Sequence, residues 1–157
     1  MNERPHRQRL NWTGQLTEGL EAMRKVEGAL ARSGLSPRLL ALIKTRASQL
    51  NGCAYCLHMH SEEAYKARET PDRLLLLDAW RESALYTEQE RAALAWTEAL
   101  TRIADTHAPD EVYEEVRRHF SDKELVDLST AIAMINAWNR LAIGFRAAHP
   151  ADAKEAA

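Results

Sequence analysis

The sequence predicts an all-α fold, and three observations support this prediction. Only six glycines and five prolines interrupt the 157 residues. Apolar residues recur with a period near 3.6, which places them on one face of a helix. Segments in which polar and β-branched residues alternate, as they do in strands, are absent from the sequence. Hydrophobic residues make up 45% of the chain and charged residues 28%, so the chain can bury the core of one domain.

The helical domain is expected to extend from residue 11 to residue 149. Residues 1–10 are polar and basic and are predicted to form a flexible arm, and residues 150–157 a flexible tail. About seven helices are expected within the domain. They cover residues 13–33, 37–50, 52–67 and 71–83, a segment from Thr87 through Ile103, and residues 109–118 and 121–147.

Three of these helices have a clear local signal at one or both ends. Ser36 followed by Pro37 is an N-cap and a first helical residue, and Asn51-Gly52 ends the same helix. Two later helices begin with a capping box, in which a Ser or Thr is followed three residues later by Glu. These boxes are Thr87-x-x-Glu90 and Ser121-x-x-Glu124. The leucine run at 74–77 predicts that the fourth helix is well buried, and the last helix has an apolar face. That face comprises Leu125, Leu128, Ile132, Ile135, Trp138, Ala142 and Phe145.

The chain has two cysteines, Cys53 and Cys56, which form a C-x-x-C pair at the start of the third predicted helix. A disulfide between them closes too small a loop to constrain the unfolded chain, so stabilising the fold is a poor explanation for the pair. At about 100° per residue, Cys53, Cys56 and His60 lie within about 60° of one another on the helix. The two sulfurs can then bond and separate without refolding, and His60 can accept or return a proton. The pattern indicates thiol redox chemistry.

A zinc site is a weaker interpretation of the same residues. His58 points away from Cys53, Cys56 and His60, and ligands on one continuous helix cannot surround a tetrahedral ion. The sequence has no second ligand pair of this type on another segment. We therefore expect no metal site.

The stretch LIKTRASQLNGCAYCLHMHSEEA (42–64) resembles the central motif of the AhpD-like alkylhydroperoxidase and carboxymuconolactone decarboxylase family. The downstream segments 74–82, 90–101 and 124–142 are similar to the family's small single-domain members. The resemblance implies an all-helical trimer or hexamer that reduces hydroperoxides through Cys53 and Cys56. It also implies a proton relay through His60 and regeneration by a dithiol or thioredoxin-like donor, with no metal, haem, flavin or other cofactor.

The resemblance and the helix position favour different cysteines as the attacking thiol. The resemblance assigns this role to Cys56, whereas Cys53 is nearer the positive end of the helix dipole. The chain also departs from the family pattern at one position. Active peroxidases of the family carry a glutamate twelve residues before the first cysteine, and here that residue is Ala41. Glu63, one turn after His60 on the same face, is the candidate replacement.

The sequence thus predicts a thiol-dependent hydroperoxide reductase with Cys53, Cys56, His60 and Glu63 as its catalytic residues. Two alternatives stay open, a lactone decarboxylase-like enzyme and a dithiol sensor or binding module without turnover. A formal charge of −2 gives no basic surface for nucleic acid or an anionic membrane. No apolar run is long enough for a membrane span or a signal core. We expect a cytoplasmic homo-oligomer.

Overall fold

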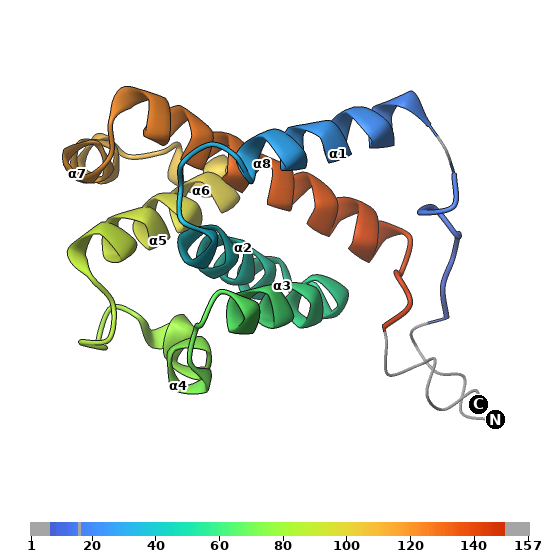
Figure 1. Cartoon of the computed structure of the whole chain (residues 1–157), viewed down its shortest axis with the longest axis horizontal. Coiled ribbons are helices and arrows are strands. Elements are labelled where there is room, and N and C mark those ends of the chain that lie inside the picture. Colours follow the sequence, from blue (N-terminus) through green and yellow to red (C-terminus); the bar gives the residue numbers. More distant parts are fainter. Residues whose placement is uncertain (1–6, 16, 150–157) are drawn as a thin grey trace.

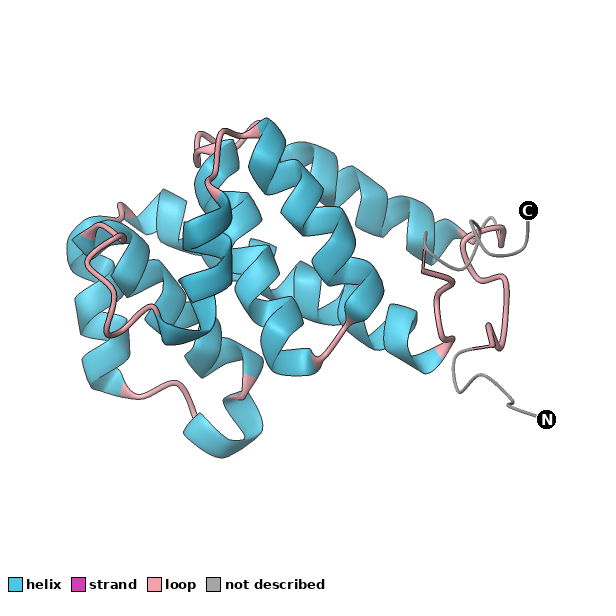
Figure 2. Ribbon diagram, turned by 90° about the horizontal axis from the view of Figure 1, so that it is seen from below, coloured by secondary structure: helices cyan, strands magenta, loops and turns pink. Residues whose placement is uncertain are grey.

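The computed structural model describes residues 7–15 and 17–149, and the regular structure in these ranges is entirely helical (Figures 1 and 2). Residues 1–6 of the expected arm and the whole expected tail at 150–157 lie outside the described residues. The described residues form eight α-helices and one 3₁₀ helix. They are α1 (Glu18–Leu30), α2 (Pro37–Asn51), α3 (Ala54–Lys66), α4 (Pro71–Leu75), η1 (Leu76–Ala79), α5 (Glu88–Thr101), α6 (Ile103–Thr106), α7 (Asp110–His119) and α8 (Asp122–Gly144).

The all-α prediction is confirmed, and so are the helix starts that rest on capping residues. Ser36 caps α2 through the backbone N–H of Leu39. Both capping boxes are formed, at Thr87 for α5 and at Ser121 for α8. These starts depend on contacts within four residues, which is why sequence alone locates them.

The first helix is shorter than predicted. It begins at Glu18 and not near Thr13, because the hydroxyl of Thr17 accepts a hydrogen bond from the N–H of Leu20 and caps the helix there. Its last residue is Leu30, and a turn follows before Gly34. The last helix likewise ends at Gly144, before the predicted limit at residue 147.

Two other predictions about the helices are wrong. The segment 71–83 is not one well-buried helix, since it divides into α4 and η1. Leu75 is 80% exposed, whereas Leu77 is fully buried. The buried residues Arg73, Leu77 and Trp80 follow one another at steps of four and three, so they lie on one face and the leucines between them, Leu75 and Leu76, lie toward solvent. The helix predicted from Thr87 through Ile103 is also shorter, because α5 ends at Thr101, and the exposed Ile103 begins the separate helix α6.

Helix α2 lies in the centre of the molecule and packs against α3, α5 and α8 (Figure 1). Its side chains Leu42, Ile43 and Ala47 have no exposed surface. Helix α8 packs against α2 and α5 and also contacts α1 and α3, so α1 and α3 lie near the same long helix. This arrangement brings residues of α1, α2, α3 and α8 together around the cysteines. No helix in the described ranges combines the length and apolarity needed to cross a bilayer.

Candidate active site

The turn between α2 and α3 sets the position of the cysteines. Gly52 ends α2 with φ 70° and ψ 35°, in the left-handed region that only glycine adopts without strain. The N–H of Cys53 then donates to the carbonyl of Ser48 over 3.0 Å, which satisfies an acceptor at the helix end. Asn51-Gly52 therefore stops α2 as the sequence predicts, and α3 begins two residues later, at Ala54.

Cys53 is the N-cap of α3 and not a residue of its first turn, which corrects the predicted helix start at Gly52. Its backbone is extended, and its sulfur accepts a hydrogen bond from the N–H of Cys56 over 3.3 Å. Cys56 lies within the first turn. The two are joined by a disulfide, with their Cα atoms 5.3 Å apart. A cysteine at the N-cap has its sulfur where the unpaired N–H groups of the helix stabilise negative charge.

The disulfide is buried among apolar side chains. Cys53 is 2% and Cys56 1% exposed, and Trp12, Leu20 and Ala142 belong to the same apolar cluster. Trp12 precedes α1 and contacts the rings of two residues at the end of α8, Trp138 and Phe145. The segment before Trp12 also contacts the end of α8, because the N–H of Arg9 donates a hydrogen bond to the carbonyl of Phe145.

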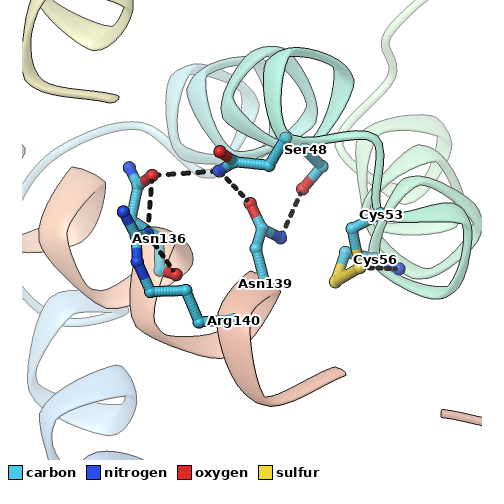
Figure 3. The surroundings of a disulfide bond; sticks show 7 residues. Ser48, Cys53, Cys56, Asn136, Asn139 and Arg140 are labelled. Carbon is cyan, nitrogen blue, oxygen red and sulfur yellow. Dashed lines mark hydrogen bonds between the residues drawn. A yellow bond between two sulfur atoms is a disulfide. The ribbon is translucent and has the colours of Figure 1, made fainter. Parts of the chain in front are cut away.

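A buried polar network holds the end of α2 against α8 beside the disulfide (Figure 3). The side-chain amide of Asn51 donates to the side-chain oxygens of Asn136 and Asn139, over 2.9 and 2.8 Å. The amide of Asn139 donates in turn to the hydroxyl of Ser48. Asn139 is 1% exposed, so each of these groups depends on the others for its hydrogen bonds. The network fixes the turn that carries Cys53.

A pocket of about 340 Å³ opens beside the disulfide. Cys56, His60 and Glu63 line it, whereas Cys53 does not. The remaining lining residues come from the segment before α1 and from α1, α2, α3 and α8. They are Trp12, Thr13, Arg24, Glu27, Lys44, Tyr55, Met59, Trp138 and Ala142. The four residues predicted from the sequence thus lie together in the structure. Cys56, His60 and Glu63 line the pocket, and Cys53 is bonded to Cys56 behind it.

His60 and Glu63 form a close pair in this pocket. Nδ1 of His60 lies 2.7 Å from Oε2 of Glu63. This hydrogen bond, the largest influence, holds the pKa of Glu63 below its ordinary value, although partial burial of the carboxylate acts in the opposite direction. An ionised carboxylate only accepts hydrogen bonds, so Nδ1 of His60 must donate. The other ring nitrogen, Nε2, is buried and has no hydrogen-bond partner among the described residues.

A second ion pair lies next to Glu63. Nζ of Lys44 is 2.5 Å from Glu27 of α1, whose other carboxylate oxygen accepts a hydrogen bond from the indole N–H of Trp138. The charge of Lys44 also contributes to the lowered pKa of Glu63. The sequence analysis did not single out Glu27 or Lys44, because they belong to separate helices and no spacing relates them. Ala41, where family peroxidases carry glutamate, lines an adjoining hollow together with Glu27, Lys44 and Glu63.

Three other carboxylates, Glu62, Glu90 and Glu98, do not line this pocket. Glu90 pairs with Arg73, and Glu98 pairs with Arg46 and Arg81. Glu62 is exposed and lies 3.7 Å from His58. No group of three or more potential metal ligands occurs among the residues that the structure describes.

Arg46 and Arg140 do not line this pocket. Arg46 pairs with Asp78 and Glu98, and Arg140 donates to the backbone and side-chain oxygens of Asn136. Arg46 is itself buried but pairs with the exposed Asp78, and Arg140 belongs to the α2–α8 network described above (Figure 3).

Residues 15–99 match the model of the carboxymuconolactone decarboxylase family, more than half of the chain. The chain belongs to this family. Its curated relatives include the uncharacterised protein YdfG of Bacillus subtilis, which is 41% identical over 143 residues that cover 90% of this chain and 97% of YdfG. The match confirms the resemblance identified from the sequence.

Two solved structures of similar proteins extend the comparison. A protein of unknown function from Agrobacterium tumefaciens, ATU0492, described as a candidate antioxidant defence protein AhpD, is 46% identical with a TM-score of 0.88. That similarity covers 92% of this chain and 99% of ATU0492. An uncharacterised peroxidase-related protein from Silicibacter sp. TM1040 is 26% identical with a TM-score of 0.71, covering 82% of this chain and 68% of that protein. This chain therefore has an AhpD-like fold.

Proposed function

We propose that this chain is a thiol-dependent hydroperoxide reductase that uses Cys53 and Cys56 as a redox-active dithiol. The observation that carries the proposal is the position of Cys56, which is bonded to Cys53 and also lines a pocket that contains the His60–Glu63 pair. A nucleophilic thiol, a proton donor and a second thiol are the three groups that this reaction needs.

In the first step, the Cys56 thiolate attacks the terminal oxygen of the hydroperoxide. The S–O bond forms as the O–O bond breaks, and the departing alkoxide takes a proton from Nε2 of His60 and leaves as an alcohol. The sulfur of Cys56 is oxidised to a sulfenic acid while the peroxide is reduced. Glu63 accepts a hydrogen bond from Nδ1 and stabilises the protonated ring before the transfer.

In the second step, the thiol of Cys53 attacks the sulfenic sulfur of Cys56. The S–S bond forms, and the hydroxyl group leaves as water with the proton of Cys53. A dithiol or thioredoxin-like donor then reduces the disulfide by exchange and becomes a disulfide itself. Both sulfurs already lie in positions that allow the bond, so the step requires no refolding of α3.

We assign attack to Cys56 and resolution to Cys53, and the pocket supports this order. Cys56 lines the pocket, and His60 follows it by one helical turn, whereas the sulfur of Cys53 caps the helix. Glu63 supplies the carboxylate that the family's peroxidases have at the position of Ala41. Ala41 of α2 and Glu63 of α3 line the same hollow. The carboxylate of Glu63 therefore lies near the place where a glutamate at position 41 would put its own.

A limiting pulse of hydroperoxide on the reduced protein, followed by mass spectrometry, tests the order of attack. The wild type is expected to form the 53–56 disulfide, and Cys53→Ser a sulfenic acid at Cys56 that a dimedone-type reagent traps. Cys56→Ser is expected to consume no hydroperoxide. Undiminished consumption in Cys56→Ser would overturn the assignment, and consumption by a variant lacking both cysteines would reject the proposed function.

Turnover separates an enzyme from a dithiol sensor. With excess hydroperoxide and a small dithiol as donor, the wild type is expected to consume many equivalents of peroxide for each chain. Consumption that stops after one equivalent, although the donor reduces the disulfide, would favour the sensor. The same assay on a variant lacking both cysteines controls for direct reaction between the donor and the peroxide.

A further inference from the structure

The pocket beside Cys56 is much larger than hydrogen peroxide requires. Its volume is about 340 Å³, whereas one water molecule in the liquid has a share of about 30 Å³. The walls are largely apolar side chains, namely Trp12, Tyr55, Met59, Trp138 and Ala142. Such a lining favours a substrate with an apolar group about the size of an aromatic ring, because its binding removes apolar surface of both the substrate and the pocket from water.

The charged side chains of this pocket are paired, with one exception. Lys44 pairs with Glu27 at 2.5 Å, and His60 pairs with Glu63 at 2.7 Å. Arg24 on α1 also lines the pocket, but it has no hydrogen bond or ion pair with any residue in the described ranges. Arg24 is exposed, so its guanidinium faces water at the edge of the pocket.

We propose that the substrate is an organic hydroperoxide that carries a carboxylate at the far end of an apolar body, and that Arg24 binds this carboxylate. This inference rests on the proposed function and names its substrate class. The apolar walls enclose the body, Cys56 reaches the hydroperoxide group, and the guanidinium of Arg24 pairs with the carboxylate. Arginine suits this role because its planar group donates two parallel hydrogen bonds to a carboxylate.

The two ion pairs explain why a carboxylate is drawn to Arg24 and not to the other cation of the pocket. Glu27 already neutralises Lys44, so a second carboxylate at Lys44 would face like charge. Glu63 likewise disfavours an anion close to His60. An anionic substrate therefore lies with its charge toward Arg24 and its neutral hydroperoxide group toward Cys56.

A pair of aryl hydroperoxides that differ by one para carboxylate tests this specificity. The second-order rate constant for oxidation of the reduced protein is measured with each, for the wild type, Arg24→Gln and Arg24→Lys. Lys25→Gln is the matched control, because it removes the same charge from the adjacent exposed residue of α1, which does not line the pocket.

The wild type is expected to prefer the carboxylate-bearing hydroperoxide. In Arg24→Gln this preference falls about tenfold, as expected for loss of one charge-assisted contact, while Arg24→Lys retains part of it and Lys25→Gln all of it. An equal preference in Arg24→Gln and the wild type would overturn the inference, as would an equal loss in Lys25→Gln.

Binding of an unreactive probe keeps this inference distinct from the peroxidase proposal. An aryl carboxylate without the hydroperoxide group is titrated while the fluorescence of the pocket tryptophans, Trp12 and Trp138, is followed. Binding that Arg24→Gln weakens supports the anion site even if no hydroperoxide is reduced. Reduction of both hydroperoxides at equal rates, together with binding that Arg24→Gln leaves unchanged, rejects the anion site and keeps the peroxidase.

Discussion

At position 63, one carboxylate determines which nitrogen of His60 is free to transfer a proton. Glu63 is a positioning residue in this scheme, since it contacts His60 and not the reacting sulfur. In Glu63→Gln, a neutral amide replaces the carboxylate, and the reaction with hydroperoxide is expected to slow by about tenfold or more. The measurement is the second-order rate constant for peroxide reduction as a function of pH.

The pH dependence has a definite sign. The pKa of Glu63 lies below its ordinary value of 4.5, so the carboxylate stays ionised through neutral pH. The deficit of Glu63→Gln is therefore constant at neutral pH and shrinks only as the pH falls through the lowered pKa of Glu63, where the wild type loses its charge. Glu62→Gln is the matched control, because Glu62 is exposed and contacts His58 instead. A deficit of equal size in both variants would show that the contact with His60 is not its cause.

Gly52 is the second residue with a measurable individual effect. An alanine there meets no atom within 4 Å, so its cost comes from the positive φ alone. We expect Gly52→Ala to lower the free energy of unfolding by about 1 kcal/mol, measured by urea denaturation. Gly144→Ala is the control, since it also meets open space but lies at the end of α8 without a positive φ. Equal stability of the two variants would contradict the prediction.

At the level of the helices, a buried carboxylate joins three elements. Glu69, between α3 and α4, accepts hydrogen bonds from Arg38 of α2 and Arg73 of α4, and Arg73 also pairs with Glu90 of α5. The side chain of Glu69 has no exposed surface. In Glu69→Gln, the positive charges of Arg38 and Arg73 are only partly neutralised. We therefore expect a loss of about 3 kcal/mol in the free energy of unfolding at neutral pH.

Acid is expected to remove this difference. Burial raises the pKa of Glu69, but the hydrogen bonds from Arg38 and Arg73 outweigh it and hold the pKa below 4.5. A group with a lowered folded pKa stabilises the protein above its unfolded pKa, and this stabilisation is lost as the pH falls through the folded value. Urea denaturation of the wild type and Glu69→Gln between pH 7 and pH 3 should converge, and a constant difference would contradict the assignment.

The helices and the site differ in how far the sequence predicts them. Ser36, Thr87 and Ser121 start helices through contacts with residues three positions away, so local patterns locate them. The grouping of Cys56, His60 and Glu63 follows from the helical repeat in the same way. The pairing of Glu27 with Lys44 depends on how α1 crosses α2, and no local pattern specifies that crossing. Arg24 and Trp12 enter the pocket for the same reason.

At the scale of the whole molecule, the exposed leucines of the α4–η1 segment favour self-association. Leu75 is 80% and Leu76 40% exposed, which leaves apolar surface in contact with water. We expect the 17.8 kDa chain to form a trimer or hexamer. The double variant Leu75→Glu, Leu76→Glu is expected to shift this equilibrium toward the monomer, and sedimentation equilibrium measures the shift. Val126→Glu, at another exposed apolar residue, is the control, and equal dissociation in both variants would place the interface elsewhere.

The sulfur of Cys53 makes two contacts with the same residue. It accepts a hydrogen bond from the N–H of Cys56, and it is covalently bonded to the sulfur of Cys56. In the oxidised chain, the bond to Cys56 holds the Cys53 sulfur in this capping position. Reduction breaks that bond, and the Cys53 side chain can then rotate away from the N–H of Cys56. Electrons delivered to the dithiol therefore loosen the opening turn of α3, and their removal tightens it. Deuterium uptake at the Cys56 amide should accordingly be faster in the reduced chain, which makes the start of this helix a record of its oxidation state.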